Sequence, residues 1–405
     1  MSDGVEVPLA DHNKAIRSLL SAAAVRERAH EMLELALDGR VDGWRVDLPA
    51  LAEAAERTAA VTRELYPSLD VPFHARWRHF VAGPPRLVQG DPQERARASF
   101  DLVILSVLLD AGSGPSWRYC GAEGTTFSRS EGLAVASQHM FESGAFAEDG
   151  VSARADGAAL VGLAVGAVAS GFQAGDGNPL VGLEGRTELL RRLGRQIAAR
   201  PDLFGGRPGG LFDVLARRSE CGRLPASAVL ELMLEALGPI WAGRLEVDGV
   251  PLGDCWRHSA IRRDDASDGL VPLHKLSQWL SYSLIEPLQE AGIEVVEIDG
   301  LTGLAEYRNG GLFIDAGVLV MLDKRDAARE HQVGDPLIVA WRAMTVALLD
   351  RMAPLVRERL GVTEADFPLA RMLEGGSWAA GRRIAAELRP GGGPPLNIIS
   401  DGTVF

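Results

Sequence analysis

A single carboxylate, Asp401, interrupts an apolar segment at positions 397–405. An unpaired carboxylate in apolar surroundings is costly, so we expect this side chain to meet a partner or a ligand. The glycine- and proline-rich stretch at 391–395 favours a sharp turn just before it. An Asp in a turn with Gly402 would explain the same pattern without any function.

A dense group of cationic and aromatic residues occupies positions 71–80. Arg76, Arg78 and His79 could grip an anion, since arginine presents a fork of donors that suits phosphate. Trp77 could form a wall of an apolar pocket beside them. The alternative is a surface arginine pair whose aromatic neighbours belong to the core.

A polar helix start at 126–132 offers a second place for an anion. Free N–H groups at a helix N-terminus, together with Ser128, Arg129 and Ser130, would make a phosphate cradle. A capping box formed with Glu131 explains the same residues equally well.

Three polar side chains, Glu306, Arg308 and Asn309, lie in a glycine-rich apolar frame at 301–311. A carboxylate and an amide there could hold the donors and acceptors of a urea or of a nucleobase edge. The alternative is a surface pair of Glu306 and Arg308 around a turn, which would contribute little to stability.

Two further segments carry candidate ligand residues. Arg186 ends the segment 176–186, for which a structural turn and helix start is the main interpretation and ligand binding the alternative. Glu374 and Trp378 lie in a loop that leads into the last expected helix. Both could face the same cleft as Asp401.

Composition sets limits on the function. The chain has 405 residues and a formal net charge of -13, so a nucleic-acid partner is not expected. A local basic pocket for one phosphate is compatible with this charge. Three cysteines without a CxxC pair indicate a reducing compartment, and we predict a cytoplasmic protein that does not enter a membrane. No motif for nucleotide, dinucleotide or metal binding is present, so we expect neither a cofactor nor a metal. The oligomeric state stays open.

Apolar periodicity and helix start and stop signals predict a mainly α fold with a small β element. We treat 1–405 as one unit; glycine-rich breaks near 205–210 and 242–255 favour, as the alternative, two helical lobes at 1–205 and 206–405. Alternating or extended segments are expected at 293–298 and 396–399. The expected helices cover 25–37, 48–65, 91–109, a stretch beginning near 128, 157–171, 185–198, 225–238, 275–290, 335–360 and 375–388.

Long segments in a fixed order resemble the uracil catabolism protein four family, which belongs to a fungal and bacterial pathway from uracil to urea. The resemblance implies a role in a pathway that converts uracil to its ribonucleotide, opens the ring and finally releases urea. The matching segments are 71–80, 101–119, 128–137, 178–186, 284–289, 301–314, 373–382 and 395–405.

A weaker resemblance concerns the segment 304–308, Leu-Ala-Glu-Tyr-Arg. It is similar to an Ala-Asp-Tyr-Arg motif of the queuosine-phosphate N-ribosyl hydrolases, helical proteins related in fold to helix-hairpin-helix DNA glycosylases. Those enzymes use an Asp close to the C-terminus, and Asp401 stands in a comparable place here. The chain departs from that motif by having Glu306 in place of Asp. The resemblance carries over Glu306, Arg308 and Asp401 only.

The resulting hypothesis is an N-ribosyl hydrolase that acts on a phosphorylated, nucleoside-derived small molecule, without metal or cofactor. Asp401 would stabilise positive charge on the sugar or orient water. Glu306 and Asn309 would hold the urea, while Arg78, Arg129 and Arg186 would anchor the phosphate. The alternatives are a hydrolase or lyase of an open-chain acyl urea and a non-catalytic scaffold for the ring-opening enzyme.

Overall fold

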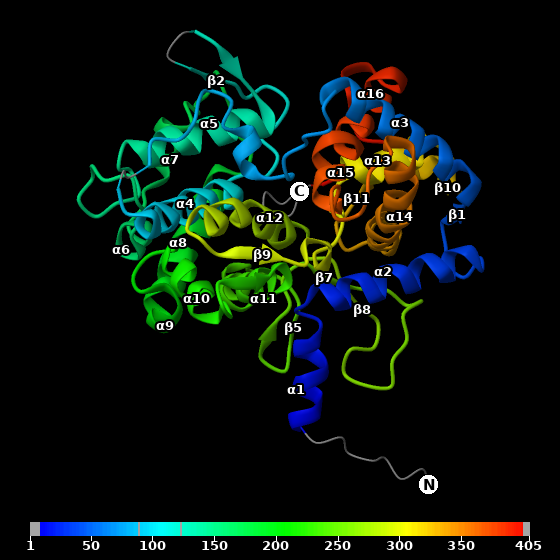
Figure 1. Cartoon of the computed structure of the whole chain (residues 1–405), viewed down its shortest axis with the longest axis horizontal. Coiled ribbons are helices and arrows are strands. Elements are labelled where there is room, and N and C mark those ends of the chain that lie inside the picture. The colour runs from blue at the N-terminus through cyan, green and yellow to red at the C-terminus, as the bar shows by residue number, and fades with distance from the viewer. Residues whose placement is uncertain (1–8, 88–89, 122–123, 400–405) are drawn as a thin grey trace. The chain divides into compact units, whose positions relative to one another are not determined.

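The computed structural model describes residues 9–87, 90–121 and 124–399, and the side chains from residue 13 onward. Most of the chain is helical, as the coiled ribbons of Figure 1 show, which confirms the mainly α prediction. The relation to DNA glycosylases stays a prediction. The α-helices are α1 Leu9–Ser18, α2 Ala22–Leu37, α3 Leu51–Leu65, α4 Pro92–Leu108, α5 Arg129–Glu142, α6 Gly157–Val161, α7 Val165–Gly171, α8 Leu183–Ala199, α9 Pro201–Phe204, α10 Gly210–Arg218, α11 Ala226–Leu237, α12 Lys275–Glu290, α13 Tyr307–Asp315, α14 Pro336–Leu360, α15 Leu369–Met372 and α16 Trp378–Leu388.

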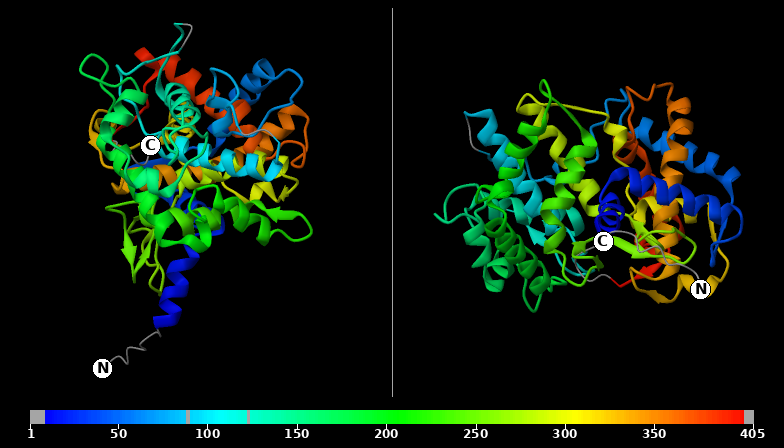
Figure 2. Two further views of the ribbon diagram at one scale, coloured as in Figure 1. Left: turned by 90° about the vertical axis from the view of Figure 1, so that its left-hand side faces the viewer. Right: turned by 90° about the horizontal axis from the view of Figure 1, so that it is seen from below.

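The strands are short and pair two by two, as the small arrows of Figure 2 show. The antiparallel pairs are β1 Trp44–Val46 with β10 Leu319–Met321, β2 Tyr119–Cys120 with β3 Thr126–Phe127, β5 Glu246–Val247 with β6 Val250–Pro251, and β7 Cys255–Arg257 with β8 Leu270–Pro272. The parallel pairs are β4 Arg223–Pro225 with β9 Glu294–Val296, and β11 Glu330–His331 with β12 Asn397–Ile398. Both extended segments expected from the sequence, 293–298 and 396–399, therefore contain a strand.

The described chain divides into two compact units, each made of separate stretches. Unit 1 comprises the described residues of 1–72, 243–275 and 299–399. Unit 2 comprises those of 73–242 and 276–298, so positions 205 and 206 both lie inside it.

Helix α14 is the centre of unit 1, where it packs against α2, α3 and α13. Pro336 begins it at a position where a missing N–H is tolerated, and Gly361 ends it in a left-handed conformation that suits glycine. Ala343, Met344 and Val346 on its middle turns are fully buried. The apolar surface of this long helix therefore holds the elements that position the candidate residues of unit 1.

Helix α4 has the same place in unit 2, packing against α5, α8 and α10. The Asp91 side chain caps it by accepting the Gln93 N–H at 3.0 Å. Its residues from Ala98 to Leu108 are buried all round, which explains the unbroken apolar run.

Three local predictions need correction. Residues 157–171 form two short helices, α6 and α7, because the chain leaves helical geometry around Gly162–Ala164. Ser128 lies at the N-cap of α5 but its side chain accepts no capping hydrogen bond, so the capping box is wrong. Residues 307–315, for which no helix is expected from the sequence, form helix α13.

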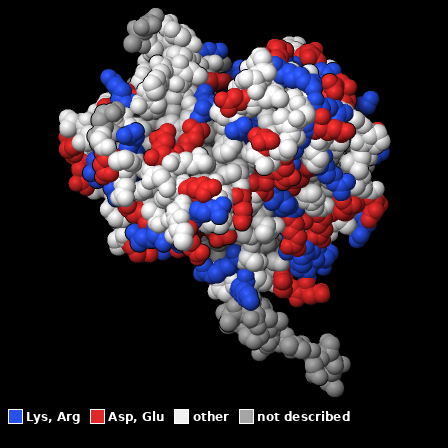
Figure 3. Space-filling view, viewed as in Figure 1, with Lys and Arg blue, Asp and Glu red and all other residues white. Residues whose placement is uncertain are grey.

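None of the described helices is long and apolar enough to cross a bilayer. On the face shown in Figure 3, lysine and arginine are interspersed with aspartate and glutamate.

Candidate functional site

Glu306 begins helix α13 in unit 1. Its Oε2 accepts the Arg308 N–H at 2.7 Å and its Oε1 accepts the Asn309 N–H at 2.6 Å. These bonds satisfy two N–H groups that have no partner inside the helix. Glu306 and Arg308 are only 7% and 6% exposed, so the alternative of a surface pair around a turn is wrong.

Asn309 joins α13 to an irregular turn of the last helical region. Its Oδ1 accepts the Ser377 hydroxyl at 2.8 Å, and its Nδ2 donates to the Leu304 carbonyl at 3.4 Å. Ser377 ends the π-helical segment η6, Leu373–Ser377, and such segments often occur at functional sites. The Asn309 amide thus fixes α13 against η6.

The predicted residues Glu374 and Trp378 come from the same region, one within η6 and the other at the start of α16. The guanidinium of Arg382 lies 5.4 Å from the Trp378 ring centre. A Cβ on Gly381 would lie 2.1 Å from the Arg308 carbonyl oxygen, so only glycine allows α16 to approach α13 this closely.

Arg308 has few partners for a buried cation. Its Nη1 donates to the Gly392 carbonyl at 2.8 Å, and its Cζ lies 4.8 Å from the centre of the Tyr307 ring. No other hydrogen bond and no ion pair to its side chain is present among the described residues.

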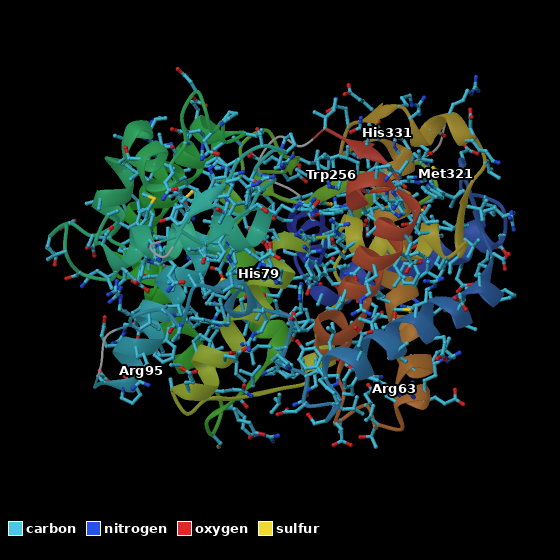
Figure 4. All side chains as sticks on the ribbon, turned by 90° about the horizontal axis from the view of Figure 1, so that it is seen from above. Arg63, His79, Arg95, Trp256, Met321 and His331 are labelled. Carbon is cyan, nitrogen blue, oxygen red and sulfur yellow. The ribbon has the colours of Figure 1, made fainter. Side chains whose placement is uncertain are left out.

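The C-terminal strand brings the chain back onto unit 1. Strand β12 runs beside β11, and the Ile399 N–H donates to the His331 carbonyl at 2.9 Å. His331, labelled in Figure 4, is fully buried, and its Nε2 lies 2.8 Å from the Asp326 carbonyl oxygen. Asp401, the predicted catalytic carboxylate, lies outside the described residues.

The anion site predicted at 71–80 is a buried ion-pair cluster in unit 2. Arg76 is fully buried; its Nη1 lies 2.8 Å from Asp110 Oδ1, and its Nε donates to the Ser106 hydroxyl at 2.7 Å. Burial lowers the pKa of Arg76, and the adjacent Asp110 carboxylate opposes that shift.

Ser130 and His79 complete this cluster. The Ser130 hydroxyl lies 2.7 Å from both oxygens of Asp110, 2.9 Å from His79 Nδ1 and 3.0 Å from Arg76 Nη1. His79, labelled in Figure 4, also packs its ring against Trp279, with centres 5.4 Å apart. The sequence analysis missed Asp110; the only signal for it was an Asp directly after the apolar run 102–109.

Two neighbours in the same segment have partners within unit 2. Arg78 forms an ion pair with Glu286, and the Trp77 indole N–H donates to the Ser283 carbonyl at 2.8 Å. Arg129, in contrast, is exposed and has a φ of 55°, a left-handed conformation that is rare for arginine.

Arg186 serves the fold of unit 2. It is 1% exposed, and its guanidinium donates to the carbonyl groups of Leu109, Ala111, Gly112 and Val181. Burial lowers its pKa to about 10, so the cation persists at neutral pH. Each donor nitrogen of this side chain donates to a backbone carbonyl, which leaves none for a phosphate.

The predicted site residues therefore fall into two groups. Unit 2 contains Trp77, Arg78, His79, Arg129, Ser130 and Arg186, of which His79 and Ser130 contact each other. Unit 1 contains Glu306, Arg308, Asn309, Glu374 and Trp378, brought together by the packing of α13 against η6 and α16.

The comparisons with known proteins cover nearly the whole chain. A family described as "Protein of unknown function (DUF1688)" matches residues 18–405. The chain belongs to this family. It is 37% identical to "Uracil catabolism protein 4" of Lachancea kluyveri, over 95% of the chain and 98% of that protein. It is 40% identical to "Protein urg3" of Schizosaccharomyces pombe, over 97% of the chain and 99% of that protein. The relative from Lachancea kluyveri confirms the resemblance to the uracil catabolism protein four family.

Proposed function

We propose that the protein is an N-ribosyl hydrolase in uracil catabolism. Its substrate would be a ring-opened uracil ribonucleotide such as ribosylurea 5′-phosphate. Water would add to the anomeric carbon of the sugar while the bond from that carbon to the urea nitrogen breaks. The departing nitrogen takes up a proton, so the products are ribose 5-phosphate and urea.

The place in uracil catabolism is supported by the full-length similarity to a protein with that name. The match extends over 95% of this chain and 98% of the relative. In the pathway that the resemblance implies, uracil is first converted to its ribonucleotide, so the ribose has to be removed from the urea nitrogen at a later step. A hydrolase of that bond fills this requirement.

The observation that carries the reaction type is the arrangement of polar groups in unit 1. The Glu306 carboxylate is buried and held in one orientation by two backbone N–H groups. Asp401 lies outside the described residues, and its role in this proposal comes from the resemblance to the queuosine-phosphate N-ribosyl hydrolases. A carboxylate that is held in place before the reaction begins stabilises the positive charge that develops on a sugar carbon.

In this proposal Asp401 is the catalytic carboxylate, and Glu306 is the second carboxylate, facing the urea. Asn309 contributes through its position, because its amide already bonds to Ser377 and Leu304. Arg78 and Arg129 stay predictions as phosphate ligands.

The experiment is an assay of the purified protein with ribosylurea 5′-phosphate, in which ribose 5-phosphate and urea are measured separately. We expect both products in equal amounts and their loss in Asp401→Asn. The control is Asp248→Asn, an exposed position with a φ of 51° that asparagine tolerates. Full activity of Asp401→Asn would contradict the assignment of Asp401, and absence of ribose 5-phosphate with the wild-type protein would contradict the hydrolase.

A second candidate function has one specific observation in its favour. In unit 2, the Ser130 hydroxyl touches both a carboxylate and an imidazole, from Asp110 and His79. A serine with such neighbours could attack the carbonyl of an acyl urea. Product identity separates the two candidates, because acyl-urea hydrolysis releases a carboxylic acid and leaves any ribose bound to nitrogen.

A further inference from the structure

Among the described residues, every buried arginine except one has its charge compensated by an ion pair or by several carbonyl groups. A buried guanidinium needs an anion or several good acceptors, because its charge is poorly solvated. Among the described residues with buried side chains there are six arginines: Arg28, Arg76, Arg186, Arg207, Arg308 and Arg342.

Five of them are compensated within their own unit. Four form ion pairs, namely Arg28 with Glu27, Arg76 with Asp110, Arg207 with Asp101 and Glu94, and Arg342 with Asp254. Arg186 instead donates to four backbone carbonyl groups.

Arg308 is the exception. One nitrogen, Nη1, donates to the Gly392 carbonyl, and the Tyr307 ring lies beside the charge. Its Nε is enclosed and has no acceptor, and no described carboxylate pairs with the guanidinium. A carbonyl and an aromatic ring compensate part of the charge, but neither supplies the negative charge that four of the other five have.

The unused donors have a defined geometry. Nε and Nη2 lie on one edge of the planar guanidinium, and together they can bind two oxygens of one anion. The backbone of Arg308 is fixed by the Glu306 cap and by its close contact with Gly381, so this edge is held in place. The cap also occupies the N–H groups of the helix start, which leaves the guanidinium as the anion donor.

The loop that contacts Arg308 has room beside it. Segment η7, Pro390–Gly392, provides the carbonyl that accepts from Nη1. A Cβ added at Gly391 or Gly393 would meet no atom within 4 Å, so the two glycines that flank Gly392 border open space.

We propose that Arg308 binds the phosphate of a sugar-phosphate substrate. The identity of the sugar rests on the proposed function, whereas the anion subsite rests on the uncompensated charge. Phosphate is chosen over a carboxylate because the substrate of the proposed reaction carries a phosphate monoester and no carboxylate.

The test is calorimetric titration of the full chain with inorganic phosphate, with ribose 5-phosphate and with acetate. We expect phosphate and ribose 5-phosphate to bind, and the affinity for both to fall at least about tenfold in Arg308→Gln and less in Arg308→Lys, since lysine keeps the charge and loses the fork. The matched control is Arg45→Gln in the same unit, with a side chain that is 58% exposed, and we expect no change there. Circular dichroism shows whether each variant is folded, and Arg308→Met provides a second variant without donors.

Several results would overturn the proposal. Phosphate binding that is unchanged in Arg308→Gln and Arg308→Met excludes Arg308 as the ligand. Loss of binding in Arg129→Gln but not in Arg308→Gln places the anion in unit 2. Acetate that binds as tightly as phosphate contradicts the choice of a phosphate monoester.

Failure of the hydrolase would look different. If phosphate binds through Arg308 but no ribose 5-phosphate is released from ribosylurea 5′-phosphate, the anion subsite stands and the proposed reaction does not. If hydrolysis occurs and Arg308→Gln leaves KM unchanged, the reaction stands and the subsite does not.

Discussion

Arg76 in unit 2 and Arg308 in unit 1 are both buried, but their surroundings differ in kind. Arg76 meets a carboxylate and two hydroxyl groups, from Asp110, Ser106 and Ser130. Arg308 meets one carbonyl and one aromatic ring. The charge of Arg76 is compensated within the protein, whereas no described carboxylate compensates the charge of Arg308.

This difference shows why residue type alone does not locate a ligand site. The segment 71–80 has the higher density of cationic side chains, and the sequence favours it for anion binding. In the folded chain its charges are largely used by the protein: Arg76 by Asp110, and Arg78 by Glu286. Arg308, a lone arginine in a glycine-rich segment, has no carboxylate partner among the described residues, and we propose it as the anion ligand.

The largest expected effect tests whether Arg76 depends on its partner. Asp110→Ala should destabilise the protein by about 3–5 kcal/mol, because it leaves a buried cation without its carboxylate. Urea unfolding followed by circular dichroism measures the loss. The double variant Arg76→Met with Asp110→Ala removes both charges and should recover most of it. A loss below about 1 kcal/mol in the single variant would show that the pair does not govern this region.

A second buried ion pair, Asp254 with Arg342, predicts how the stability of the protein depends on pH. Asp254 in unit 1 accepts two hydrogen bonds from Arg342 at 2.8 Å, and a further one from the Trp256 indole. Burial acts to raise the pKa of Asp254, but the charge and hydrogen bonds of Arg342 outweigh it and lower that pKa well below its usual range. The folded-state pKa is depressed, so the stabilisation is complete above the unfolded pKa of about 3.9 and is lost as pH falls below it.

We therefore expect Asp254→Asn to cost about 3–5 kcal/mol at pH 7. The difference between wild type and variant should be about 1 kcal/mol smaller at pH 3, since a pKa unit corresponds to 1.36 kcal/mol. Unfolding curves at the two pH values measure this. Asp47→Asn, with a side chain that is 42% exposed, is the control. A difference that grows on acidification would contradict the depressed pKa.

The parts of the fold that the sequence predicts correctly depend on neighbouring residues. Ser21 caps α2 by accepting the Ala24 N–H at 3.2 Å, and Asp91 caps α4. Each cap can be predicted from the sequence because its donor and acceptor lie within three positions of each other.

The parts that escaped prediction depend on distant residues. Helix α13 is absent from the helices expected from the sequence, and its Gly310 is required by packing: a Cβ there would lie 2.7 Å from the Trp341 ring. Asp110 was missed because its partner, Arg76, is 34 positions earlier and becomes a neighbour only in the fold. Neither the packing of Gly310 against Trp341 nor the ion pair of Arg76 with Asp110 can be predicted from residues that are neighbours in the sequence.

A smaller effect tests the cap that orients α13. Glu306→Ala should destabilise the protein by about 0.5–2 kcal/mol, because two N–H groups lose their acceptor. Glu306→Asp should retain most of the stability, since aspartate is a good N-cap. Thermal unfolding of both variants makes the comparison, with the exposed Glu364→Ala as control. Equal stability of Glu306→Ala and wild type would show that the cap is not needed to form α13.

The smallest effect on stability is expected where the effect on ligand binding is largest. Arg308→Met removes a buried charge that has no carboxylate partner and keeps most of the side-chain volume. Replacing a buried charge by an apolar side chain is often neutral or stabilising, so we expect a change between about -1 and +1 kcal/mol in the absence of phosphate. Arg76→Met, which leaves Asp110 unpaired, should instead destabilise. Urea unfolding with and without inorganic phosphate separates the two arginines: phosphate should stabilise the wild type and the Arg76→Met variant and leave Arg308→Met unchanged. If Arg308→Met is as destabilising as Arg76→Met, the guanidinium serves the fold and the contrast between the two regions disappears.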